Sequence, residues 1–376
     1  MAEAIQSANT LAPTTGTSAS RKRIIYQSEA LFATQAGQSS TSAHNIKRVQ
    51  SVNYSFTVPR TDVNQFGTLG QIERVITEVP TVNLDFSYHL NGVVNELLLL
   101  GTGGAGGPTT GFLRDINNPD STVYSLDFKV GLAGEGVDYN SGNPPTKSGI
   151  IIPNGFLSSY SWTGAVGDVP NATVNAESTE MKVAEMAGTI FPTNQPFSSS
   201  KPVVLRPGNV NFHSAATSGA DPDTNTDLPV LGFDVIHVQS FTVSIDIPRE
   251  SISRMGDKFE FAKVITFPMQ ATMSVEAIVS SQAASNLNLI VGAAGATSPD
   301  PGFNIDIRCK KPTDDADVQG INLRFKNAKI EGHSISSSIG ANKSVTLDYA
   351  VQVDAGGQAY GATGGAGFYI DSSTGL

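Results

Sequence analysis

The chain is poor in cysteine and in long hydrophobic runs, and each scarcity excludes a class of protein. Cys309 is the only cysteine among 376 residues, so no internal disulfide framework can form. Its alignment with Val130 in the repeat described below predicts a small, buried strand residue. No apolar run approaches the roughly 18 residues that span a bilayer, and residues 1–20 contain no apolar signal-peptide core. We therefore expect a protein that is made and used in soluble form.

Charge is also scarce, because Asp, Glu, Lys and Arg make up only 15% of the chain and the net charge is −10. Affinity for nucleic acid comes mainly from Lys and Arg that neutralise phosphates. The compact basic clusters at residues 21–23 and Lys310-Lys311 are too small for a nucleic-acid stripe, so tight DNA binding is not expected. Abundant Gly, Ser, Thr and Asn favour a β-rich structural protein with many turns.

Signatures of catalysis and of metal binding are weak or missing. The five histidines are isolated from one another, and no HExxH, CxxC or GxSxG motif occurs. Gly101, Gly103 and Gly106 spell GxGxxG, but they lie in a Gly/Pro-rich loop outside any βαβ pattern. The Asp-rich residues 221–227 lack the Gly and the terminal Glu of an EF-hand. We expect neither an enzyme nor a cofactor or metal site.

What the chain does contain is a repeat of itself. Residues 49–77 align without a gap with residues 238–266, which lie 189 positions later, and the two segments share Pro-Arg, a Gly seven residues on and a closing Val-Ile-Thr. Similarity continues at shorter offsets, and this predicts a tandem duplication in which equivalent strands of two copies superpose. The expected organisation is an N-terminal arm at 1–19, copy 1 at 20–178, a linker at 179–199, copy 2 at 200–353 and a Gly-rich tail at 354–376.

Apolar and polar residues alternate in four segments, residues 50–58, 82–89, 240–247 and 271–277. This period of two predicts half-buried antiparallel strands. Each copy has a long connection between its two strands, residues 60–80 and 249–268. A tight hairpin needs only two to five residues, so the retained length indicates a function; packing over the sheet edge is the alternative. Residues 91–100, with Asn91 as cap, and 280–291 are predicted to form one helix per copy.

These features resemble the tail tube (major tail) proteins of long-tailed bacteriophages. The resemblance lies in the strand that begins Val49-Gln50-Ser51 and ends at Pro59-Arg60, in residues 62–67 and in residues 78–88. It implies a mainly β fold with two tandem tail-tube-like β-barrel or sandwich domains, each with a short flanking helix. Many tube proteins carry a single barrel, so the double length is a departure from the family.

The resemblance also implies a function and partners. Barrels of neighbouring chains would pair edge to edge into a ring, and stacked rings would form a hollow tube that passes double-stranded DNA. Rings of this family commonly hold six barrels, so a chain with two would form a ring as a trimer. Expected partners are the chain itself and other tail proteins, such as a tape measure, a terminator and possibly a sheath, in the virion after assembly in the host cytoplasm. We expect no membrane partner.

Two sets of residues follow as candidate sites. Polar rows of the alternating strands are predicted to line the channel: Ser51, Asn53, Ser55, Thr57, Asn83, Asp85, Ser87, Ser240, Thr242, Ser244, Asp246, Thr272 and Glu276. Charged residues of the two long connections are predicted to contact the next ring: Arg60, Asp62, Arg74, Arg249, Glu250, Arg254 and Lys258.

Two other functions fit the composition less well. A secreted adhesin or carbohydrate-binding β-sandwich protein would need a signal peptide and clustered exposed aromatics, whereas Trp162 is the only tryptophan. Another virion ring or decoration protein is a second alternative within the structural class.

Overall fold

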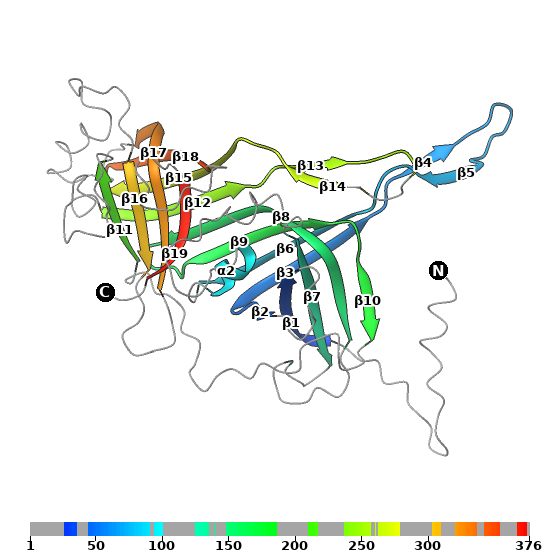
Figure 1. Ribbon diagram of the computed structural model, residues 1–376, viewed down its shortest axis with the longest axis horizontal. Coiled ribbons are helices and arrows are strands. Elements are labelled where there is room, and N and C mark those ends of the chain that lie inside the picture. Colours follow the sequence, from blue (N-terminus) through cyan, green and yellow to red (C-terminus); the bar gives the residue numbers. More distant parts are fainter. Residues whose placement is uncertain are drawn as a thin grey trace, which may run out of the picture.

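The computed structural model describes residues 26–35, 44–90, 94–100, 125–134, 139, 148–185, 210–216, 237–256, 260, 262–278, 303–309, 320–336, 342–353 and 367–373. Within these ranges the protein is mainly β, as the sequence predicts, and fifteen strands form one antiparallel hydrogen-bonded network. Two short hairpins project from this network (Figure 1). The sheet does not close into a barrel within the described residues.

The centre of the molecule is a wide antiparallel sheet, hereafter the main sheet. Neighbouring strands in it are hydrogen-bonded in the order β3, β6, β9, β8, β12, β15, β18 and β17. Their bounds are Val49–Thr57, Thr81–His89, Asn171–Ser178, Ser148–Ala165, His237–Asp246, Met269–Ile278, Ser344–Val353 and Gly320–Ser336.

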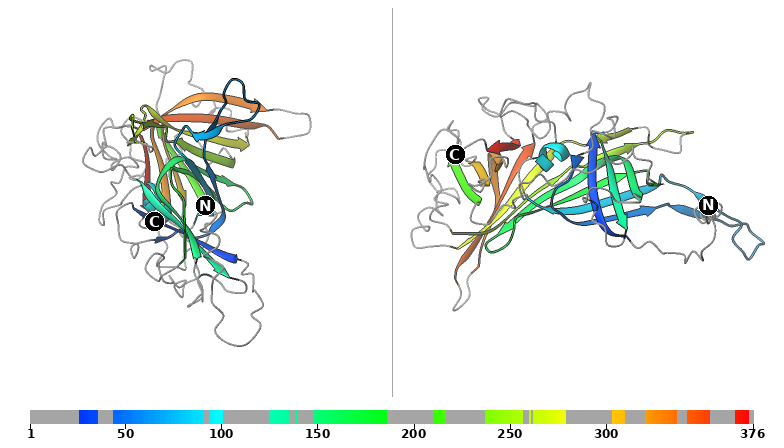
Figure 2. Two further views of the ribbon diagram at one scale, coloured as in Figure 1. Left: turned by 90° about the vertical axis from the view of Figure 1, so that its right-hand side faces the viewer. Right: turned by 90° about the horizontal axis from the view of Figure 1, so that it is seen from below.

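Two smaller groups of strands run steeply against the main sheet, one under each half (Figures 1 and 2). The first contains β1, β2, β7 and β10, and it pairs with the N-terminal part of β8. The second contains β11, β16 and β19, and it pairs with the N-terminal part of β17. Bounds are Tyr26–Gln35, His44–Asn45, Leu126–Gly134, Lys182–Glu185, Val210–Ala216, Phe303–Cys309 and Gly367–Ser373.

The long strands β8 and β17 belong to two layers because each contains a bulge. Pairing of β7 with β8 shifts register between Leu126 and Phe128, and Asn154 lies there with φ of 50°. Asn327, with φ of 58°, lies beside the corresponding shift between β16 and β17. Bulges bend strands, and Asn tolerates the left-handed region better than most residues.

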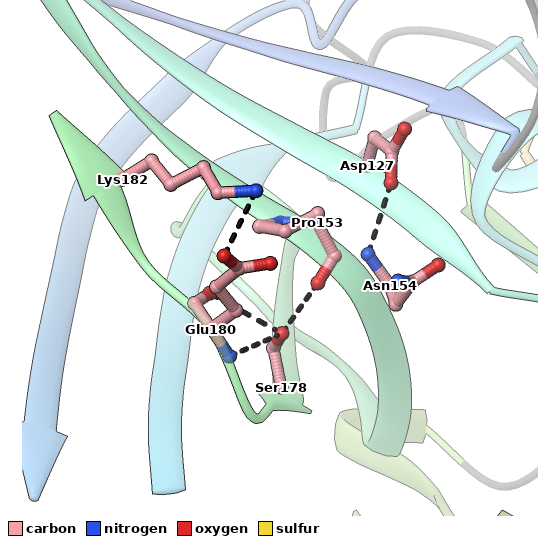
Figure 3. A network of polar contacts seen from close by, with 6 residues as sticks. All are labelled: Asp127, Pro153, Asn154, Ser178, Glu180 and Lys182. Carbon is pink, nitrogen blue, oxygen red and sulfur yellow. Dashed lines mark hydrogen bonds and ion pairs between the residues drawn. The ribbon is translucent and has the colours of Figure 1, made fainter. Parts of the chain in front are cut away.

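Hydrogen bonds hold the first bend against its neighbours (Figure 3). The backbone N–H of Asn154 donates to Asp127 Oδ1 at 2.9 Å, and Ser178 Oγ donates to the carbonyl of Pro153. An ion pair of 2.8 Å joins Lys182 and Glu180 where the chain turns into β10. These contacts fix the angle between the two layers in the first half.

The apolar face of the main sheet packs on the smaller groups to form one continuous core. In the first half Phe86 of β6 contacts Phe128 of β7 with ring centroids 5.9 Å apart. Within the second smaller group, Phe325 and Phe368 are directly opposed in the β17–β19 ladder, with ring centroids 4.9 Å apart. The largest fully buried side chain is Trp162 of β8, near the middle of the main sheet. Burial of one such side chain contributes about 2–3 kcal/mol.

Both halves of the chain pair their strands in the same order. The first half has the order β1, β7, β8, β9, β6, β3, and the second has β11, β16, β17, β18, β15, β12. Even irregularities match, since the β3–β6 ladder shifts register between Val49 and Ser51 and the β12–β15 ladder shifts between Val238 and Ser240. Every residue of the β3–β6 ladder and its equivalent in the β12–β15 ladder are 189 positions apart, as in the sequence repeat.

Some expected elements differ in extent or fall outside the described residues. The first helix is present as α2, Val94–Leu100, whereas its expected cap Asn91 and the second helix at 280–291 lie outside them. So do the GxGxxG loop, residues 221–227, residues 21–23 and Lys310-Lys311. Cys309 ends β16, and its side chain is not described. Strands β10 and β19 lie in the expected linker and the expected tail, where no strand was predicted.

Candidate functional site

One face of the main sheet is polar from β3 at one edge to β17 at the other. Directly opposed residues in antiparallel strands share a face, and the register links Asn53 to Asp85, Asp85 to Asn175, and Asn175 to Ser159. All of the predicted channel residues in β3, β6, β12 and β15 lie on this face, and they are exposed or half-buried. The apolar neighbours of those in β6, β12 and β15 are buried in the core.

Side chains on the polar face bond across strands in both halves. Asn53 Nδ2 donates to Asp85 Oδ2 at 2.8 Å, and the hydroxyls of Ser51 and Ser87 are 2.7 Å apart. In the second half Ser240 Oγ donates to Glu276 Oε2 at 3.2 Å. These bonds leave most carboxylate oxygens to the solvent, so the face remains hydrated and acidic.

Strands β9, β8, β18 and β17 extend this face beyond the predicted residues. Their added side chains are Asn171, Thr173, Asn175, Glu177, Ser159, Ser161, Thr163, Ser344, Thr346, Asp348, Ser334 and Ser336. Alternation in residues 171–178 and 344–348 is a signal that could have identified many of them. Together with the predicted set, the face holds Asp85, Asp246, Glu276, Glu177 and Asp348. Lys329 lies on the same face, because it is opposed to Ala350, which is in turn opposed to Thr272.

The long connections form hairpins that extend the β3–β6 and β12–β15 ladders. Strands β4 and β5 (Arg60–Val63 and Glu73–Ile76) form the first, and β13 and β14 (Arg249–Ile252 and Ala262–Ile265) form the second. Both project toward the same end of the molecule (Figure 1), and every residue of β4 and β5 is exposed. Gly67 and Gly256, with φ of 94° and 95°, occupy equivalent positions at the tips.

Charged residues of the first hairpin bond to one another. Arg74 Nε lies 2.9 Å from Asp62 Oδ1, across the β4–β5 ladder, and Gln71 Nε2 donates to the same oxygen at 2.6 Å. Arg60 is exposed at the base of the hairpin. These contacts hold the two strands of the hairpin together.

Two cations of the second hairpin contact residues of the same chain outside the hairpin. Arg249 lies 5.0 Å from the ring centre of Phe156 and donates from Nε to the carbonyl of Leu157 at 3.4 Å. Lys263 forms a 2.8 Å ion pair with Glu177. Desolvation lowers the pKa of Arg249 to about 10, partly offset by Glu177. The contacts with Phe156 and Leu157 attach the hairpin to β8. Glu250 and Arg254 are exposed, and Lys258 lies outside the described residues.

Hydrophobic side chains are exposed at the hairpin tips. Phe66 and Leu69 of the first tip and Met255 of the second have relative exposures of 105%, 111% and 105%. Clustered exposed apolar residues mark interaction surfaces. The sequence prediction named only charged residues here, although Phe66, Leu69 and Met255 stand close to the two tip glycines.

A carboxyl group is buried beneath the first half of the main sheet. Glu96 of α2 accepts a hydrogen bond from the Tyr88 hydroxyl at 3.0 Å, and the neighbouring Asn95 exchanges two bonds with the backbone of Lys47. Burial raises the pKa of Glu96 to about 7, although its hydrogen bonds oppose the change. The side chain of Glu96 is buried, so the charge of its carboxyl affects the free energy of unfolding.

Stability is therefore expected to depend on the charge of Glu96. Its folded pKa of about 7 is above the ordinary 4.5, so the contribution is fully present below pH 4.5 and is lost as the pH rises through about 7. We expect wild type to lose about 3 kcal/mol relative to Glu96→Gln over this range, as measured by denaturant unfolding at pH 5 and pH 8. Exposed Glu78→Gln is the control, and equal pH dependence of wild type and Glu96→Gln would contradict the assignment.

Comparisons with other proteins give no independent identification. No family model matches the chain, and no curated protein matches it. In the described part of the chain no three His, Cys, Asp or Glu side chains are grouped to hold a metal ion. The same residues include no helix with the length and hydrophobicity to cross a bilayer.

Proposed function

We propose that this chain is a virion structural protein with a tandemly duplicated tube domain. Copies assemble into rings, and the rings stack into the hollow tail tube through which phage DNA passes. The observation that carries the proposal is the acidic, polar face across the main sheet, backed by a continuous core. The equal strand order of the two halves supports the duplication, and a chain with two tube domains gives a ring of three chains.

A channel wall for DNA must not hold the phosphates. Duplex DNA binds wherever Lys and Arg neutralise phosphates and release counterions. Carboxylates outnumber cations on the polar face, where Asp85, Asp246, Glu276, Glu177 and Asp348 lie with Lys329 among hydroxyls and amides. Such a wall repels DNA weakly, and screening by salt limits the repulsion to about 8–10 Å. DNA can therefore slide along it.

Stacking of rings is assigned to the hairpins. Both project from the same end, and their apolar tips lack burial in the single chain. Contact with the next ring would cover Phe66, Leu69 and Met255, while exposed Arg60, Glu250 and Arg254 set the orientation by charge. The partners are thus other copies of this chain, followed by the tape measure, terminator or sheath proteins of the same tail.

Negative-stain electron microscopy of the purified protein tests this function. The expected result is annular rings and tubes with an open channel. A protein that remains monomeric at high concentration would contradict the proposal. Rings that never stack would favour the alternative of another virion ring or decoration protein.

A further inference from the structure

The two halves of the chain are joined by a strand pairing that we call the internal seam. Strand β12 pairs antiparallel with residues 159–165 of β8, and flanking bonds of 2.8 Å run from Ile247 N to the Ser158 carbonyl and from Val166 N to the Gln239 carbonyl. Trp162 and Phe241 contact edge to face at 5.7 Å across it. Gly164 leaves room for Phe241, since a Cβ there would lie 2.5 Å from the ring.

Equivalent strands lie at the two outer edges of the main sheet. Strand β3 precedes β12 by the 189-residue repeat, and residues 332–336 of β17 follow residues 159–163 of β8 by 173 positions. In the described part of the chain β3 pairs with β6 alone, and residues 332–336 pair with β18 alone. One edge of the main sheet therefore carries β3, the equivalent of seam strand β12. The other edge carries residues 332–336, the equivalent of the seam residues of β8.

Apolar side chains are buried at the internal seam, where the strands are paired, and are partly exposed at the two unpaired edges. Ile245 and Trp162 are fully buried in the seam. Their counterparts Phe56 and Ile335 are 47% and 53% exposed. Large apolar residues on unpaired sheet edges promote association with another strand.

We infer that β3 of one chain pairs antiparallel with residues 332–336 of β17 in a second copy, with the register of the internal seam. That register places Asn53 opposite Ser336, Tyr54 opposite Ile335, Ser55 opposite Ser334, and Thr57 opposite Gly332. The inference rests on the proposed function and specifies its lateral contact. Because the two edges differ, the contact is head to tail, and the proposed ring requires that its repetition closes after three chains.

The polar face continues across this contact without a break. Ser55 and Ser334 occupy the places of Ser244 and Ser161, which are opposed on that face in the internal seam. The flanking bonds at Ile247 and Val166 place Ser244 and Ser161 in a non-hydrogen-bonded pair, where Cα atoms are about 4.5 Å apart. That distance permits a disulfide.

Cysteine cross-linking of the full chain tests the register. In a Cys309→Ala background, Ser55→Cys with Ser334→Cys should give chains covalently linked between molecules, seen on non-reducing gels. The matched control at the internal seam, Ser161→Cys with Ser244→Cys, should cross-link within one chain. The staggered pair Ser55→Cys with Ser336→Cys should lose the product, because diagonal positions are about 7–8 Å apart.

Electron microscopy of the same samples separates the two proposals. Rings with cross-links at Ser55 and Ser334 only are the expected result. Rings that cross-link in the staggered pair, or in neither pair while the internal control succeeds, overturn the register and leave the ring function standing. Monomers at every concentration, with the internal control cross-linked, overturn both.

Discussion

Replacing the first hairpin, residues 60–76, by an Asn-Gly turn is expected to give folded protein that forms rings but no long tubes. The backbone N–H of Thr77 donates to the Pro59 carbonyl at 3.4 Å, so a two-residue turn can close the ladder at the same place. All residues of β4 and β5 are exposed, and their removal should change the free energy of unfolding by less than about 1 kcal/mol.

The expected loss of stacking is large because the tip residues are apolar. Burial of a Phe or Leu side chain contributes about 1.5–3 kcal/mol, and each ring would lose Phe66 and Leu69 from every chain. Phe66→Ser with Leu69→Ser should reproduce the effect without a deletion, whereas Asn64→Ser with Gln65→Ser is the matched polar control. Tube lengths measured by electron microscopy that equal those of wild type would rule out this hairpin as the stacking element.

Reversing the charge of the polar face is expected to slow DNA release. Asp85, Asp246 and Glu276 lie on that face with exposed or half-buried side chains, and their replacement by Lys creates several phosphate contacts per ring. Summed over stacked rings, contacts of roughly 1 kcal/mol each should stall ejection at low salt. Higher salt should restore release, because the observed affinity falls steeply with salt concentration.

The neutral triple variant Asp85→Asn, Asp246→Asn, Glu276→Gln is the matched control. It changes the same positions without adding cations, so its release rate should stay near wild type at both salt concentrations. DNA release would be measured from virions whose tubes appear normal by electron microscopy. Wild-type release by the lysine variant at low salt would show that these side chains do not line the path of the DNA.

Local periodicity made much of this fold predictable. Alternation in residues 50–58 and 82–89 shows which side chains share a face, because a strand places successive residues on opposite sides. The repeat extended this prediction to β12 and β15. The long connections were expected to have a function, but their hairpin form depends on pairs such as Asp62 with Arg74 that no periodicity reveals.

Features that depend on distant partners could not be read from the sequence. Pro153-Asn154-Gly155 marks a break in the sequence of β8, because Asn-Gly is typical of turns. That the strand continues through the break into a second layer, with Asn154 in a left-handed conformation, depends on the neighbouring strands. Pairing of β8 with β12 joins segments about 80 residues apart. From the sequence alone Glu96 would be expected on the exposed face of a helix. In the structure it is buried and accepts a hydrogen bond from Tyr88.

In the proposed ring, the internal seam has a consequence for the kinetics of assembly. Because β8 and β12 belong to one polypeptide, this lateral contact forms during folding at a rate independent of protein concentration, and the linkage supplies a high effective concentration. In a ring of such chains half of the lateral contacts exist before any two molecules meet. Ring closure then requires fewer bimolecular encounters, so it depends less steeply on concentration than closure from separate single-domain subunits.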